Sequence, residues 1–325
     1  MRFVLMIEAQ QGLSYREQLD IARTAEAAGF EAMFRSDHYS SFPGPGNNPT
    51  TDAWAVLAGL ARETSRIGLG VLVSPVTFRL PGNLAKVVST VDEMSGGRIE
   101  VGVGAGWNET EHRAYGFPFP PIHVRAEMLE EQLTILHGLW TEPDGWSFHG
   151  KHYTIEDACY RPKPIDAPGR PRTASGAVRP RIIVGGGGSP RSMRIAARFA
   201  DEFNVTSADP DVVAGKYAAL RDACAAIGRD PESMTRSAMI GVLVGADDAE
   251  MRRRERDLLA ALEIDSGDDW FATRRRRWII GTPDEARETV ARYAAAGVER
   301  IMLQDFLPRD LGMIELLGRE LVRPV

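Results

Sequence analysis

The residues that could carry chemistry in this 325-residue chain stand directly after short apolar segments. Ser36, Asp37 and His38 follow the apolar run 30–34. An imidazole beside a carboxylate can accept or donate a proton near neutral pH, so Asp37 and His38 form a candidate acid–base pair. The same residues could instead cap a strand end or form a solvated loop. The sequence leaves both interpretations open.

A second candidate group follows the apolar run 98–103. Glycines occupy every other position of 102–106, and Trp107, Asn108 and Glu109 come next. Alternating glycines let a flat ligand approach the backbone closely. Trp107 offers such a ligand a stacking surface, and Asn108 and Glu109 offer polar contacts. A tight turn with no ligand is the alternative.

A run of four glycines forms the third candidate group, after the apolar segment 181–184 and before a helical pattern. A glycine-rich segment at a helix N-terminus presents free N–H groups and the positive end of the helix dipole to an anion. We therefore expect a phosphate site here, with a plain flexible loop as the competing interpretation. The residues concerned are Gly185, Gly186, Gly187, Gly188 and Ser189.

Several other chemistries are disfavoured because their motifs are missing. The sequence has no HExxH, no H-x-H after its first apolar run and no G-x-S-x-G, so we predict no metal site and no simple acyl transfer. Its two cysteines, Cys159 and Cys224, cannot build a disulfide framework or a CxxC metal site. This usage is typical of a reducing cytoplasm.

Composition indicates a soluble globular protein. Hydrophobic residues make up 43% of the chain and charged residues 26%, which is ordinary for that class. The net charge of −6 argues against nucleic acid and anionic membranes as partners. The apolar N-terminus reaches Glu8 too soon for a signal peptide, and no segment approaches the roughly 20 apolar residues that span a bilayer. We expect a cytoplasmic protein with a small-molecule substrate.

Short β-type runs alternate with longer helical patterns along the chain. Eight such alternations favour a closed (β/α)8 TIM barrel over a doubly wound sheet. The G-x-G-x-x-G motif that a doubly wound sheet would carry after its first strand is also missing from the sequence. In such a barrel the active site lies at the C-terminal ends of the strands. The predicted strands are 2–7, 30–34, 66–73, 98–103, 181–184, 202–205, 237–244 and 300–304.

The whole chain, residues 1–325, is expected to form one barrel domain with two irregular segments. Residues 140–180 are rich in proline, glycine and aromatic residues and are too long for an ordinary connection. We expect them to be an insertion at the C-terminal face of the strands that covers one side of the barrel mouth. Residues 266–277 are expected to form a mobile loop.

Four segments together resemble the bacterial luciferase-like monooxygenase superfamily, and more closely its branch that uses coenzyme F420, an 8-hydroxy-5-deazaflavin. They lie in the expected order over nearly the whole chain. Together they are specific for the superfamily, whereas each segment alone is a weak signal. The segments are 29–38 (GFEAMFRSDH), 98–107 (RIEVGVGAGW), the loop 185–189, and 281–285 (GTPDE) with Gly297 and Val298.

The resemblance implies a role for each candidate group. His38 would be the proton donor or base beside the reacting carbon, and Asp37 would contact the coenzyme near its ring. A non-prolyl cis peptide bulge at Val71 and Leu72, to within one residue, would lie against the ring. Ala105, Gly106 and Asn108 would line the coenzyme, and Gly185 to Ser189 would hold its phosphate. Phe42, Trp107 and Glu109 would form the substrate pocket.

The resemblance also implies the reaction. We expect a coenzyme F420-dependent oxidoreductase that transfers a hydride between the deazaflavin and a small organic substrate. The first alternative is an FMN-dependent monooxygenase that uses oxygen and reduced flavin supplied by a separate reductase. The second is a non-catalytic flavin-binding barrel. Members of the family are often homodimers, so a homodimer is expected.

Overall fold

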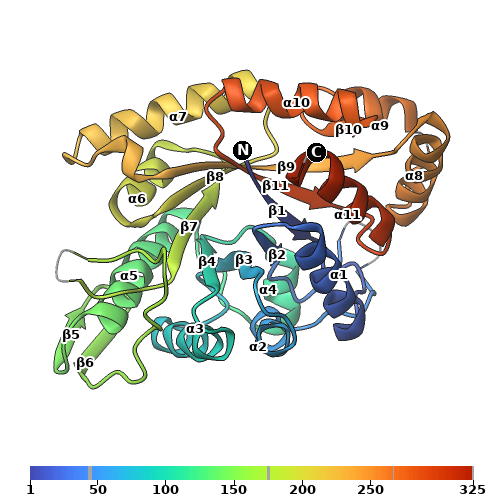
Figure 1. Cartoon of the computed structure of the whole chain (residues 1–325). Helices are drawn as coiled ribbons and strands as arrows, with labels where there is room; N and C mark the ends of the chain where they lie inside the picture. The colour runs from blue at the N-terminus through green and yellow to red at the C-terminus, as the bar shows by residue number, and fades with distance from the viewer. Residues whose placement is uncertain (43–45, 174–175, 266, 324–325) are drawn as a thin grey trace.

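Parallel strands close into a barrel in the computed structural model, which describes residues 1–42, 46–173, 176–265 and 267–323 (Figure 1). The strands follow one another around the barrel in chain order, and the last pairs with the first. Each coincides with a predicted strand, so the predicted (β/α)8 barrel is confirmed. The barrel strands are β1 (Arg2–Ile7), β2 (Ala32–Arg35), β3 (Gly68–Pro75), β4 (Ile99–Gly104), β7 (Arg181–Gly186), β8 (Glu202–Thr206), β9 (Thr235–Val244) and β11 (Arg300–Asp305).

Helices surround the barrel and return the chain from the end of one strand to the start of the next (Figure 1). The first begins with a capping box, in which Glu17 N donates to Ser14 Oγ at 3.3 Å and Ser14 N donates to the Glu17 carboxylate at 2.8 Å. No helix in the described part of the chain is both long and apolar enough to cross a membrane. The helices are α1 (Tyr15–Ala28), α2 (Ala53–Glu63), α3 (Pro81–Ser95), α4 (Glu109–Tyr115), α5 (Ile122–Thr141), α6 (Pro190–Phe199), α7 (Pro210–Ala225), α8 (Asp248–Ala261), α9 (Gly267–Arg274), α10 (Pro283–Ala295), α11 (Leu311–Leu317), the 3-10 turn η1 (Pro231–Ser233) and the π turn η2 (Gly318–Val322).

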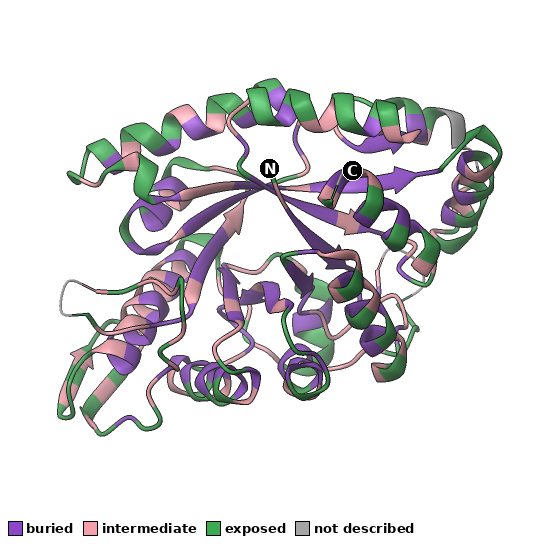
Figure 2. Ribbon diagram, viewed as in Figure 1, coloured by how far each residue is buried: buried purple, intermediate pink, exposed green. Residues whose placement is uncertain are grey.

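The barrel strands are mostly buried on both faces and are largely purple in Figure 2, with a few half-buried residues in pink. Outward-facing residues pack against the helices, and alternate residues fill the barrel. At the N-terminal end of the barrel, Arg300 pairs with Glu100 at 2.7 Å and with Glu202 at 2.9 Å. The inner core above this ion pair consists of Val4, Met6, Ala32, Phe34, Leu72, Ile183 and Met302.

In its described residues, the long insertion does not cover the barrel mouth, so that prediction was wrong. Residues 140–180 contain the hairpin β5 (Trp146–His149) and β6 (Thr154–Ala158), which lies beside α5 (Figure 1). Further along, Arg170 donates to the carbonyl of Gly97, just before β4, and Arg179 pairs with Asp201, just before β8. A segment that leaves the end of a helix starts at the N-terminal face of the barrel, whereas the mouth is built by segments that leave strand ends. The exposed Cys159 follows β6, while Cys224 is buried in α7.

Residues 266–277, predicted to be a loop, are largely helical. Residue 266 lies outside the described residues, and α9 begins directly after it. Phe271 and Trp278 are buried, and Trp270 contacts both rings, with centroids 4.9 Å and 5.2 Å away. This aromatic packing stabilises a short helix, which is hard to predict from the sequence because charged residues surround the aromatic ones. The chain continues into the short strand β10 (Ile279–Gly281), which pairs with β9 outside the barrel order.

Candidate active site

The barrel mouth at the C-terminal ends of the strands is open to solvent. The inner core is buried, but the inward-facing residues just above it, including Val73, Met239 and Gln304, are only partly buried. At Gly186 and Gly187 an added Cβ would meet no atom within 4 Å. The predicted site residues lie around this opening because each follows a barrel strand.

His38 is the reactive side chain best placed at the mouth. Its Nδ1 lies 2.8 Å from the Glu111 carboxylate, which is 1% exposed and also accepts a hydrogen bond from Tyr39 N at 3.0 Å. A buried carboxylate on one ring nitrogen favours the tautomer with its proton on that nitrogen. Among the described residues nothing bonds to Nε2. The lone pair of Nε2 is then available as a base.

The carboxylate that pairs with His38 belongs to Glu111, and not to Asp37 as the sequence suggested. The Asp37 carboxylate is buried and accepts hydrogen bonds from Ser74 Oγ at 2.7 Å and Arg79 Nη1 at 2.5 Å. Arg79 also pairs with Asp52 at 2.5 Å. Burial by itself would lower the pKa of Arg79, but these two carboxylates raise it overall, so the guanidinium stays charged. Asp37 therefore belongs to an ion-pair network that supports the β2 and β3 strand ends, and it does not pair with His38.

Sequence reasoning missed Glu111, although a pattern was present. Glu109 and Glu111 stand two residues apart just after the glycine-rich run, and α4 begins at Glu109. Glu109 is exposed in the first turn, whereas Glu111 is buried against the β2 side of the mouth. Two acidic residues after a barrel strand could have been read as a catalytic pair.

Two aromatic rings flank His38, and both belong to residues that were predicted to line the substrate pocket. The Phe42 centroid lies 4.4 Å from that of His38, and the Trp107 centroid lies 5.8 Å away. Trp107 is 65% exposed, which is unusual for an indole and leaves much of its face free. Arg125 holds the segment before it by donating to the carbonyl of Ala105 at 3.0 Å. The structure thus brings His38, Phe42 and Trp107 together, while Glu109 is exposed and Asn108 precedes α4.

The end of β3 has the predicted irregularity, one residue later than Val71–Leu72. The cis peptide joins Leu72 and Val73, and the register of β3 with β4 shifts between Val71 and Ser74. The bulge packs so closely against the glycines of β4 that it leaves no room for a Cβ there. A Cβ at Gly102 would lie 2.2 Å from the Val71 carbonyl oxygen, and one at Gly104 would lie 2.8 Å from Val73. Glycine is required at both positions.

Gly185 and Gly186 end β7, and Gly187, Gly188 and Ser189 join this strand to α6. Ser189 caps α6 by accepting from Ser192 N at 3.2 Å, and Pro190 opens the helix. The absence of neighbours around Gly186 and Gly187 leaves a space beside the helix N-terminus. This cradle fits a phosphate group, which backbone N–H groups and the helix dipole would stabilise.

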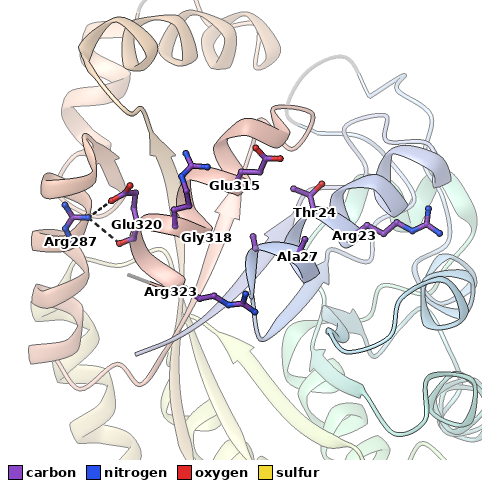
Figure 3. Close-up of a pocket in the computed structure, with 10 residues that line it drawn as sticks. Arg23, Thr24, Ala27, Arg287, Glu315, Gly318, Glu320 and Arg323 are labelled. Carbon is purple, nitrogen blue, oxygen red and sulfur yellow. Dashed lines mark hydrogen bonds and ion pairs between the residues drawn. The ribbon is translucent and has the colours of Figure 1, made fainter. Parts of the chain in front are cut away.

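A separate hollow of about 1030 Å³ lies on the outer surface between α1, α10 and the C-terminal helices (Figure 3). It holds none of the predicted site residues. Two of its lining arginines are paired with carboxylates, Arg287 with Glu320 at 2.9 Å and Arg23 with Glu63 at 3.3 Å. The barrel mouth remains the candidate active site.

A parallel (β/α)8 barrel with a base, aromatic walls and a glycine-rich loop at its strand ends is an enzyme architecture. A model of the family described as luciferase-like monooxygenase matches residues 1–300. The chain belongs to this family of oxidoreductases, which confirms the resemblance found in the sequence.

Relatives of two kinds match the chain. An F420-dependent glucose-6-phosphate dehydrogenase of Microbacterium testaceum is 28% identical, with 94% of this chain and 92% of the relative covered. An FMNH(2)-dependent dimethylsulfone monooxygenase of Pseudomonas putida is also 28% identical, with 87% and 80% covered. Among solved structures, an F420-dependent secondary alcohol dehydrogenase in complex with an F420-acetone adduct superposes with a TM-score of 0.80 over 99% of both chains, at 20% identity.

Proposed function

We propose that this protein is a coenzyme F420-dependent oxidoreductase that transfers a hydride between the deazaflavin and a small organic substrate. The observation that carries the proposal is the His38–Glu111 pair, which leaves Nε2 free beside the exposed ring of Trp107. Oxidation of an alcohol requires a base for the hydroxyl proton. The F420-dependent dehydrogenase relative covers most of the chain and supports this choice.

In this proposal the residues of the chain bind the coenzyme and transfer the proton. The cradle at Gly186 and Gly187 would hold the phosphate, and the bulge at Leu72 and Val73 would support one face of the ring. When bound, the deazaflavin accepts or donates the hydride. Nε2 of His38 takes the hydroxyl proton as the adjacent carbon–hydrogen bond gives up its hydrogen with both electrons. Glu111 stabilises the imidazolium that results, and Nε2 returns the proton in the reverse direction.

The competing function is an FMN-dependent monooxygenase, and the dimethylsulfone monooxygenase relative favours it to a similar degree. The same cradle would accept the FMN phosphate. That enzyme would need a reductase partner to supply reduced flavin, and it would consume oxygen. A purely flavin-binding role finds no support among these relatives, which are enzymes.

The deciding experiment is a fluorescence titration of the purified protein with F420 and with FMN. We expect micromolar binding of F420 and weaker binding of FMN. In His38→Ala, turnover with F420 should fall by roughly 10²- to 10⁴-fold, while the coenzyme dissociation constant stays unchanged. Tighter binding of FMN with substrate-dependent oxygen uptake would establish the competing function. Full turnover in His38→Ala would contradict the role of His38.

A further inference from the structure

A row of hydrogen-bonded polar side chains lies at the C-terminal ends of β11, β1 and β2, just beyond the inner core. Gln304 Nε2 donates to one carboxylate oxygen of Glu8 at 2.5 Å, and Gln10 Nε2 donates to the other at 2.8 Å. Ser36 Oγ donates in turn to Gln10 Oε1. We call these four residues the polar row. The proposed proton transfer uses none of them.

The alternation of the strands places the polar row inside the barrel. Met6 on β1, Phe34 on β2 and Met302 on β11 belong to the inner core, and Glu8, Ser36 and Gln304 each stand two residues further along. Residues two apart share one face of a strand, so the row forms the next inward layer. The hydrogen bond between Gln304 and Glu8 confirms that these two side chains meet there.

The polar row lies close to the proposed base. Ser36 N still pairs with the carbonyl of Ile7, so the chain is extended at this point. His38 is two residues further on, and two residues of extended chain span at most about 7 Å. A small substrate whose reacting carbon lies at Nε2 of His38 can therefore extend to this layer. Glu8 is 7% exposed, whereas Gln10 and Ser36 are 1% and 3% exposed, so Glu8 and the partly exposed Gln304 are the members that the substrate would reach.

No cation forms an ion pair with Glu8 in the described part of the chain, although the buried Arg35 lies near enough to attract its carboxylate. Both oxygens of this carboxylate are hydrogen-bonded by amides. The nearby carboxylates Asp37 and Asp52, by contrast, share Arg79. An anionic group in this layer would be repelled by a carboxylate that has no ion-pair partner, whereas a hydroxyl or ammonium group would donate a strong hydrogen bond to that carboxylate.

We infer that Glu8 determines substrate specificity and selects substrates whose second polar group donates a hydrogen bond, namely hydroxyl- or ammonium-bearing alcohols, over those that carry a carboxylate or phosphate there. This inference rests on the proposed function, because it assumes that hydride transfer takes place beside His38. Gln304 and Gln10 orient the Glu8 carboxylate and are positioning residues.

The test compares three secondary alcohols that share one carbon skeleton and end in a hydroxymethyl, an aminomethyl or a carboxylate group. Their kcat/KM values are measured with F420 for the wild type, for Glu8→Gln, and for Glu156→Gln, which removes the same charge from the exposed hairpin strand β6. We expect the first two alcohols to exceed the carboxylate by at least about tenfold in the wild type and in Glu156→Gln. In Glu8→Gln the values should converge, with the aminomethyl alcohol losing most and the carboxylate gaining.

Several outcomes would overturn the inference. These are preference for the carboxylate in the wild type, no turnover of any of the three alcohols, and an unchanged order in Glu8→Gln. Loss of F420 binding in Glu8→Gln, seen in the fluorescence titration, would assign Glu8 to the coenzyme instead. Failure of the wild type itself to bind F420 is a different result, because it contradicts the proposed function.

Discussion

The imidazole of His38 is held by contacts on several sides. Glu111 fixes Nδ1 at 2.8 Å, and the rings of Phe42 and Trp107 pack edge-on around it. A side chain restrained in this way needs little reorganisation before it takes a proton, which is how positioned acid–base groups gain their effect. We therefore expect turnover to depend on the Glu111 carboxylate, which orients the imidazole, as well as on His38 itself.

We predict that Glu111→Gln lowers turnover by roughly 10²-fold or more. Glutamine keeps the size of the side chain but can turn its amide N–H toward Nδ1, which favours the tautomer with the proton on Nε2 and blocks the base. Steady-state kinetics with F420 would measure this loss. The coenzyme dissociation constant and the melting temperature should match the wild type, and equal turnover in both proteins would contradict the prediction.

Local sequence could propose His38 but not its partner. Asp37 is adjacent to His38 in sequence, yet successive residues of an extended chain point to opposite faces, so the Asp37 side chain turns toward Ser74 and Arg79. Glu111 lies 73 residues away and reaches His38 only because α4 packs beside the segment that follows β2. Such a contact depends on tertiary structure, which adjacency in a single sequence does not encode.

At the level of elements, the barrel strands were predictable because each apolar run is short and bounded by turn or capping residues. Gly29 illustrates this, since it ends α1 with a φ of 91° just before β2. The insertion was harder to place. Its composition marked residues 140–180 as irregular, but which end of the barrel they occupy follows from whether they leave a helix or a strand. Applying that rule to the sequence would have assigned them to the N-terminal face.

The contact between the β3 bulge and β4 yields a prediction for Gly102. Its Cβ would lie 2.2 Å from the backbone oxygen of Val71, which cannot move without displacing the strand. Gly102→Ala should therefore reduce the free energy of unfolding by about 1–3 kcal/mol. Urea denaturation would measure it. The control is Gly82→Ala in α3, where an added Cβ meets nothing within 4 Å and alanine favours the helix. Equal stability of the two variants would refute the steric argument.

For the whole molecule, one buried carboxyl makes stability depend on pH. Asp305 ends β11, where its Oδ1 accepts from Leu307 N at 2.7 Å and its Oδ2 has no hydrogen-bond partner in the described part of the chain. Burial raises the pKa of this carboxyl to about 7. Because the unfolded chain loses the proton near pH 4, the contribution of Asp305 to stability is fully present below about pH 4 and is lost as the pH rises to 7.

We predict that Asp305→Asn stabilises the protein at high pH. Asparagine keeps an oxygen for Leu307 N but has no charge to bury. The variant should exceed the wild type in unfolding free energy by up to about 4 kcal/mol at pH 8 and match it near pH 4. Urea denaturation at several pH values would measure the difference. A difference that does not vary with pH would show that ionisation of Asp305 is not its cause.

An exposed thiol on the insertion offers a single point at which the molecule can be attached to a surface. Cys159 follows β6 there and is exposed, while Cys224, the other cysteine of the chain, is buried. A thiol-reactive linker would therefore attach the folded protein to a bead or electrode by one residue, in one orientation. Since this residue belongs to a segment that starts at the end of the barrel opposite the strand ends, the immobilised molecule would present its mouth to the bulk solution.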